Sequence, residues 1–181
     1  LTAATATIKS NRHTFMQTNS LAFQQALLSD EDYKNALRDV ALAMDNRFEK
    51  PLVFFADSNN ITTKEDMQTL RSIRYILNIW ERAAIACVNG LYDEHYLYKT
   101  YKSMVLDLGI QFRNFIHETQ QGRDNPDIYK NFSTLVLIWT IRRGSFSSYK
   151  RKQELKLVYK QLRTIEAGKL PKKRHKLKTF R

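Results

Sequence analysis

Apolar residues recur three and four positions apart over most of this chain, which is the spacing of one face of an α-helix. The pattern is strongest where it includes Leu70, Ile73, Leu77, Trp80, Ala84, Cys87 and Leu91. A second set widens this apolar face, namely Ile76, Ile79, Ala83 and Ala86. Thr62 and Thr63 stand three residues before Glu65 and Asp66, which is capping-box spacing, and Asn89-Gly90 is a typical helix end. We therefore predict a long central helix over residues 63–89, since so wide an apolar face needs several packing partners.

Two helices are predicted ahead of the central one. The first follows residues 1–6, which have no core-forming pattern and should fray. Ser29 offers an N-cap oxygen for the second helix, which should run to about Asn46. Pro51 ends that pattern because proline lacks an amide hydrogen. The apolar run Leu52–Phe55 is predicted as a short helix or a packed loop.

Three further helices are predicted between the central helix and residue 144. Asp93 can cap the first, and a separate run over 103–119 carries the apolar pattern of the second. Gly109 within that run indicates either a close helix crossing or a kink. Asn125-Pro126 is typical of a helix start with proline at its first position, and that helix should reach about Arg142.

The predicted fold is therefore all-α, an irregular or orthogonal bundle of about six to seven helices. We expect a helical domain over residues 1–144, then a basic C-terminal helix and flexible tail over 145–181. The last helix has a narrow apolar seam with coiled-coil spacing, formed by Leu155, Val158, Leu162 and Ile165. This seam would either dock on the domain or pair with a second copy, and the sequence leaves that choice open.

The centre of the chain also resembles a family of bacterial and phage proteins of unknown function. The matching positions are Leu77, Asn78, Trp80, Glu81, Ala84, Gly90, Tyr92, Asp93 and Glu94. The general layout from about residue 8 to residue 141 is similar as well. The resemblance implies a small all-α protein, of a kind that often carries an N-terminal transmembrane anchor. It implies no catalytic residues, because none are established for the family.

Composition disfavours several classes of protein. Cys87 is the single cysteine, so the chain forms no intramolecular disulfide and no cysteine metal cluster. We interpret it as a small buried hydrophobic residue. The sequence has no glycine-rich phosphate loop and no GxSxG motif, so we expect neither an enzyme nor a bound cofactor.

Hydropathy bears on the location of the protein. The sequence has no run of about 18 apolar residues that would span a bilayer. It begins at Leu1 rather than methionine, which leaves room for an anchor that was removed. We expect a cytoplasmic protein, or a membrane-associated one if such a segment preceded Leu1.

Metal-ligating residue types are present but show no zinc signature. The candidates are His95, His117, Asp93, Glu94 and Glu118. None forms the pair of histidines four residues apart, with an internal glutamate, that marks a helical zinc site. We therefore predict no metal site, and we interpret His13 and His175 as isolated and solvated.

Glu81 is the one acidic residue beside the apolar stripe of the central helix, and Asn78 precedes it by one turn. A buried acid with a raised pKa would be a candidate catalytic group. We favour a candidate buried polar pair of Asn78 and Glu81, in which Glu81 bonds an arginine such as Arg74, Arg113 or Arg142. Charged groups are rarely buried without a partner.

Charge is distributed unevenly along the chain. Residues 1–141 hold 15 Lys+Arg and 16 Asp+Glu, whereas residues 142–181 hold 15 and 2. The C-terminal segment thus carries the whole net charge of +12. Such an asymmetry is typical of an arm that binds a polyanion.

The predicted polyanion-binding residues are Lys150, Arg151, Lys152, Lys156, Lys160, Arg163, Lys169, Lys172, Lys173, Arg174, Lys176, Lys178 and Arg181. The leading hypothesis is a non-catalytic interaction protein whose arm binds nucleic acid or a nucleoprotein assembly, in phage or mobile-element biology. Tyr149, Tyr159 and Phe180 could stack on unpaired bases. The alternative is a membrane-associated accessory or defence protein, with its arm on anionic lipid. A solubilising tail is the third interpretation.

Overall fold

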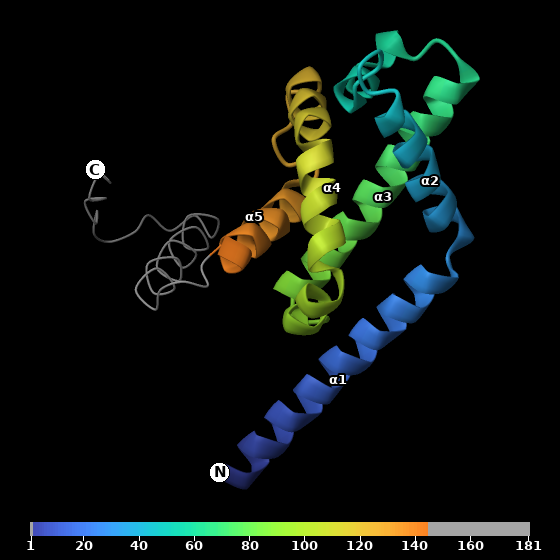
Figure 1. Ribbon diagram of the computed structural model, residues 1–181. Coiled ribbons are helices and arrows are strands. Elements are labelled where there is room, and N and C mark those ends of the chain that lie inside the picture. Colours follow the sequence, from blue (N-terminus) through green and yellow to red (C-terminus); the bar gives the residue numbers. More distant parts are fainter. Residues whose placement is uncertain (1, 145–181) are drawn as a thin grey trace, which may run out of the picture. The chain divides into compact units, whose positions relative to one another are not determined.

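A computed structural model describes residues 2–144, and all the regular structure in that range is helical (Figure 1). Five α-helices and two short 3-10 helices follow one another along the chain. They are α1 (Thr2–Ser29), α2 (Glu31–Asp45), η1 (Leu52–Ala56), η2 (Ser58–Asn60), α3 (Lys64–Val88), α4 (Glu94–Gly122) and α5 (Lys130–Gly144). The all-α prediction is confirmed for this range, whereas the predicted number of six to seven helices is too high.

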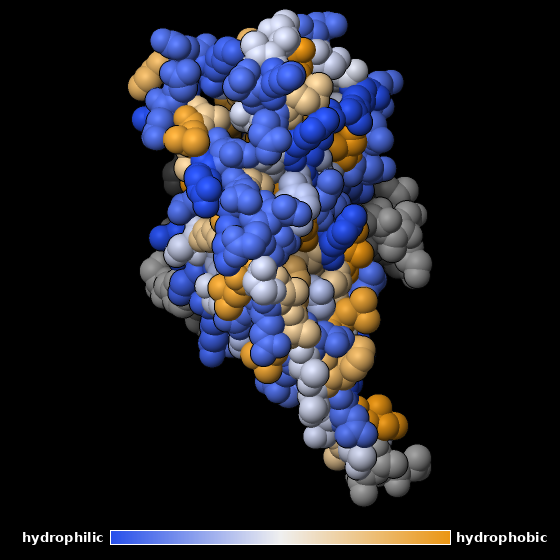
Figure 2. All heavy atoms as spheres, turned by 90° about the vertical axis from the view of Figure 1, so that its right-hand side faces the viewer, coloured by the Kyte–Doolittle hydropathy of each residue, from blue (hydrophilic) through white to orange (hydrophobic). Residues whose placement is uncertain are grey.

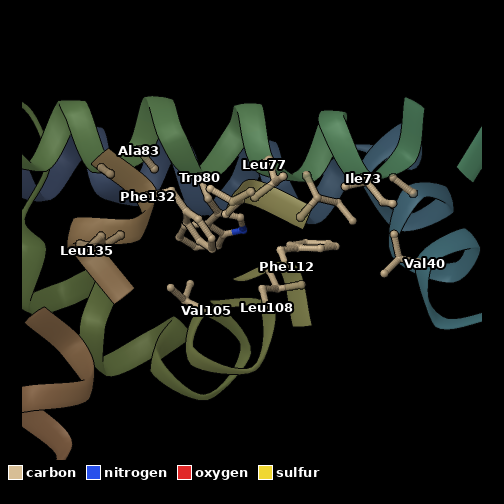
Figure 3. Packing of buried hydrophobic residues seen from close by; sticks show 14 of the residues in the cluster. Val40, Ile73, Leu77, Trp80, Ala83, Val105, Leu108, Phe112, Phe132 and Leu135 are labelled. Carbon is tan, nitrogen blue, oxygen red and sulfur yellow. The ribbon is translucent and has the colours of Figure 1, made fainter. Parts of the chain in front are cut away.

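Helix α3 is the centre of the core, as its wide apolar face predicts. Ile73, Leu77 and Trp80 are completely buried along it. In Figure 3 these side chains point toward Val40 of α2, toward Val105, Leu108 and Phe112 of α4, and toward Phe132 and Leu135 of α5. Three helices and η1 thus cover the face that the sequence pattern identified.

The ends of α3 form for the reasons that the sequence indicates. The Thr63 hydroxyl accepts a hydrogen bond from the Asp66 amide at 3.0 Å, and the Thr63 amide donates to the Asp66 carboxylate at 3.3 Å. This capping box satisfies two backbone donors that a helix start would leave unpaired. At the other end Gly90 has φ +66°, the left-handed conformation that glycine adopts most easily. The predicted boundaries of this helix are confirmed.

Helix α4 is one continuous helix where the sequence predicted two. The Asp93 carboxylate accepts a hydrogen bond from the Tyr96 amide at 3.1 Å, so the predicted cap is confirmed. The chain then stays helical through Ser103 to Gly122. Gly109 marks a close crossing, because a Cβ atom there would lie 2.4 Å from Cγ1 of Val136 on α5. The close crossing was one of the two predicted interpretations of Gly109.

Two helix starts ahead of α3 differ from the predictions. Thr2 is already helical, so the expected fraying of residues 1–6 is wrong for the part that the structure describes. Asp30, not Ser29, caps α2, since its carboxylate accepts from the Tyr33 amide at 2.9 Å. The Ser29 hydroxyl instead donates to carbonyl oxygens within α1. The run Leu52–Phe55 does form a short helix.

The start of α5 lies four residues after the predicted one. Pro126 is followed by turns, and Tyr129 has φ +55°, a left-handed value that an α-helix does not contain. The helix therefore begins at Lys130. The predicted C-terminal helix, with its seam of Leu155, Val158, Leu162 and Ile165, lies outside the described residues.

Candidate functional site

Glu81 caps the first turn of α5 from a distance of fifty positions in the sequence. Its Oε2 accepts from the Phe132 amide at 2.7 Å, and its Oε1 accepts from the Asn131 side chain at 2.7 Å and the Asn131 amide at 3.2 Å. The first amide groups of a helix have no partners within the helix, and they carry partial positive charge. The residue before α5 is Tyr129, which offers no capping oxygen. The Glu81 carboxylate, on α3, supplies the capping oxygen instead.

The interpretation of Glu81 is corrected in its details. Its hydrogen bonds come from Asn131 and Phe132 rather than from an arginine, and Asn78 is exposed. The two residues therefore do not form a buried polar pair. Glu81 is half-buried, and its carboxylate accepts three hydrogen bonds, which is the environment of a structural anion. The sequence could not reveal this arrangement, because the partners lie on another helix.

An aromatic cluster attaches α1 to α3 and α4. The Phe23 ring lies 5.8 Å from Trp80, 5.2 Å from Tyr92 and 6.4 Å from Tyr101, measured between ring centroids. Trp80 Nε1 donates to the Tyr33 hydroxyl at 3.0 Å. Burial raises the pKa of Tyr33 to about 12, so this phenol stays neutral near pH 7. The cluster packs α1 against α3 and α4.

Within residues 2–144, the Cys87 thiol has a raised pKa and the candidate metal ligands do not gather at one place. Burial, with smaller contributions from Glu94 and Asp93, raises the pKa of the Cys87 thiol to about 12. The thiol is therefore protonated near neutral pH and is a poor nucleophile. Over the described range no three His, Cys, Asp or Glu side chains gather as metal ligands would. Glu94 instead accepts a hydrogen bond from Trp139 Nε1 at 2.7 Å.

Two open clefts lie on the helical part, and both have balanced charges. The first has a volume of about 810 Å³ between α2 and the start of α3, and its charged residues are Asp39, Glu65, Asp66, Lys50, Lys64 and Arg71. Asp66 is buried there and pairs with Lys50 at 2.8 Å. The second, of about 630 Å³, lies beside η1 and the end of α4, with Arg74, Arg123, Asp57 and Glu118. Equal numbers of both signs give neither cleft a preference for anions.

The predicted polyanion-binding residues, from Lys150 to Arg181, lie outside the described residues. Among the helices that are described, none has the length and hydropathy needed to cross a bilayer.

Comparison with known proteins identifies one family. The model of DUF4760, a domain of unknown function, matches residues 1–139. This match spans the buried core of the helical part and ends within α5. No curated protein and no solved structure matches the chain.

Proposed function

The chain belongs to the DUF4760 family, a domain of unknown function, and we propose that it is a non-catalytic interaction protein whose basic C-terminal segment binds nucleic acid or a nucleoprotein assembly. The charge distribution carries this proposal. Residues 142–181 hold 15 Lys+Arg against 2 Asp+Glu, while the preceding residues are close to neutral. A segment of such density displaces counterions from a phosphate backbone, which favours binding without sequence specificity.

The two clefts described above support the proposal, because neither favours a polyanion. Each of them is lined by equal numbers of acidic and basic residues. A phosphate backbone would meet repulsion as well as attraction in either cleft. The cationic residues from Lys150 to Arg181 have almost no acidic neighbours in the sequence. Any polyanion would therefore bind the C-terminal segment first.

The test compares binding to DNA and RNA for two full-length variants that lose the same charge. In the arm variant Lys172, Lys173 and Lys176 become glutamine. In the control the exposed residues Lys64, Lys99 and Arg113 become glutamine. The arm variant should bind more weakly and with a shallower salt dependence. The log–log slope should fall by about 0.9 for each duplex phosphate that the arm no longer neutralises. The control should bind as the wild type does.

Two outcomes would contradict the proposal. Equal weakening in the arm variant and the control would mean that net charge alone drives binding. Sedimentation with vesicles rich in anionic lipid, together with no binding to DNA or RNA, would favour the membrane-associated alternative. There each Lys or Arg near the surface contributes about 1 kcal/mol.

A further inference from the structure

The turn between α3 and α4 contains the one Asn-Gly pair in the sequence. Asn89 is the C-cap residue of α3, with φ −80° and ψ 0°, and Gly90 follows it with φ +66°. The Asn89 side chain is exposed. Asparagine is a thermolabile residue, and glycine has no side chain to shield the backbone nitrogen that attacks it. The pair therefore combines a reactive sequence with access to water.

Asparagine before glycine reacts through a cyclic imide. After base removes its proton, the Gly90 backbone nitrogen would attack Cγ of Asn89, and the side-chain nitrogen would leave as ammonia. Water then opens the imide at either carbonyl. Opening at Cγ gives aspartate, whereas opening at the backbone carbonyl gives isoaspartate, whose main chain runs through Cβ and Cγ. Overall, water is consumed and ammonia is released.

The geometry of the turn holds the reacting atoms apart. At ψ 0° the Gly90 nitrogen eclipses the backbone nitrogen of Asn89, so it cannot lie in one ring with Cβ and Cγ. The Gly90 amide also donates to the Cys87 carbonyl at 3.1 Å. The next amide, of Leu91, donates to the Ala86 carbonyl at 2.9 Å. The end of α3 must therefore open locally before the ring can close.

Helix α1 is attached to this same turn. Asn19 Nδ2 donates to the Leu91 carbonyl at 3.2 Å. The Arg12 guanidinium lies against Gly90, since a Cβ atom there would be 2.6 Å from Nη2 of Arg12. The side chains of residues 10–15 are exposed, in the part of α1 that lies lowest in Figure 2. Because packing supplies most helical stability in proteins, contacts with the turn help to fix this part of α1.

We propose that Asn89 is a deamidation site, made reactive by local opening of the last turn of α3, and that its isoaspartate product loosens α1 from this turn. Isoaspartate lengthens the main chain by one carbon, so the amides of Gly90 and Leu91 are displaced from their acceptors. The Leu91 carbonyl then shifts away from Asn19. The new carboxylate also lies at the negative end of the α3 dipole, which is unfavourable. This modification does not depend on polyanion binding by the C-terminal segment.

The first test is peptide mass spectrometry of the full chain incubated at about pH 8, where base is abundant enough to remove the amide proton. The peptide that contains Asn89 should gain the mass of NH₂ replaced by OH. An isoaspartyl methyltransferase, which methylates isoaspartate but not normal aspartate, should label part of the product. In urea the reaction should be at least about tenfold faster, because the turn is then open in every molecule.

Matched variants test whether opening controls the rate. Asn19→Ala removes the hydrogen bond to Leu91 and should speed deamidation about two- to tenfold, because the turn opens more often. Ser29→Ala, at an exposed site of the same helix, should leave the rate unchanged. Asn78 is an internal control in every sample. It is exposed on α3 but precedes Ile79, so it should stay intact.

Hydrogen exchange separates the effect of the longer main chain from the effect of charge. In the purified isoaspartate form, amides of residues 14–22 should exchange at least about tenfold faster than in the unmodified chain. The buried middle of α3 should keep its protection. Asn89→Asp adds the same charge without the extra carbon and should change the exchange of residues 14–22 by less than about fivefold.

Several results would overturn the proposal. An unmodified Asn89 in the folded chain, once the urea sample has reacted, would exclude the site. Equal rates with and without urea would mean that the fold does not control the reaction. Aspartate without isoaspartate would indicate direct hydrolysis of the side-chain amide instead of ring closure. Unchanged exchange of α1 in the isoaspartate form would mean that this turn does not hold the helix.

Discussion

Helices α1 and α4 have almost the same length, 28 and 29 residues, and yet they are stabilised in opposite ways. Helix α4 buries nine residues, whereas α1 buries Ser20 and Leu27 among its described side chains. The comparison shows that helical structure alone says little about stability. The core holds α4 in place, while the first half of α1 depends on weak intrinsic propensity or on a partner.

The two helices also differ in how many charged residues they expose. Helix α4 carries charged residues on the side that faces water, as a solvated helix does. Residues 14–29 of α1 carry none, although much of this stretch is exposed. The exposed surface of this stretch is therefore less strongly hydrated than that of α4. Paired substitutions test this contrast.

The largest expected effect comes from shortening a phenylalanine on each helix. Phe112 of α4 is completely buried, and Phe112→Ala should lower the free energy of unfolding by about 3–5 kcal/mol, from lost transfer energy and a cavity. Phe15→Ala on α1 should change it by less than about 0.5 kcal/mol. Urea unfolding measures both changes in the free energy of unfolding. Similar losses would contradict the difference in packing.

The second prediction concerns Glu81, the α3 residue whose carboxylate caps α5. Glu81→Ala should lower the free energy of unfolding by about 3 kcal/mol, because the amides of Asn131 and Phe132 lose a charged acceptor. Glu81→Gln keeps one acceptor oxygen and should cost less. Thermal unfolding followed by circular dichroism would rank the two variants. Normal melting of Glu81→Ala with loss of binding would instead make Glu81 a functional residue.

The close crossing of α4 and α5 should tolerate no added methyl group. Gly109→Ala places a Cβ atom 2.4 Å from Val136, so we expect a loss of about 2 kcal/mol from overpacking. Gly122→Ala is the control in the same helix, because nothing lies within 4 Å of its added Cβ. That variant should unfold at the wild-type temperature or slightly above it. Equal effects at both positions would contradict the crossing.

A smaller effect is expected where α1 meets the start of α4. The buried Ser20 hydroxyl accepts from the Asp93 amide at 2.8 Å and donates to the Met16 carbonyl. Ser20→Ala leaves that amide without its acceptor, at a cost of about 1 kcal/mol. Ser29→Ala, at an exposed site, should have little effect. If hydrogen exchange of α1 is unchanged in Ser20→Ala, this bond does not hold the helix.

The smallest expected effect is a change in how the free energy of unfolding depends on pH. Helix α1 contains no Asp or Glu, so it adds no carboxylate to this dependence. The hydrogen bond from Lys50 is the main cause that lowers the pKa of Asp66 from 3.8. The ionised Asp66 carboxylate contributes its full stabilisation of the fold above pH 3.8, the pKa of the unfolded state. This contribution is lost as the pH falls through the lower pKa of the folded state. Asp66→Asn should therefore flatten the acid branch of the stability curve. Asp45→Asn, at an exposed position, is the control.

The sequence predicted those features that depend on neighbouring residues. The bounds of α3 follow from Thr63, Asp66 and Gly90, whose effects reach only one turn along the chain. The cap on α5 could not be predicted in this way, because Glu81 and Asn131 meet only after the helices pack. Pro126 was misleading, since the left-handed Tyr129 after it delays the helix.

The same distinction between local sequence and tertiary packing applies to the candidate sites. The uncharged run over residues 14–29 is visible in the sequence, but only the structure shows that much of it faces outward. The close crossing at Gly109 was one of two predicted alternatives, and Val136 decides between them. The basic segment from Lys150 to Arg181 remains a prediction from charge alone.

Cys87 gives the protein a built-in probe of local opening. It is the single cysteine of the chain, and its thiol is half-buried in the last turn of α3 with a pKa of about 12. A thiol-specific reagent should therefore label the folded chain slowly, at a rate set by transient exposure of that turn. The labelling rate would then report, one modification per molecule, how often the end of the central helix unravels.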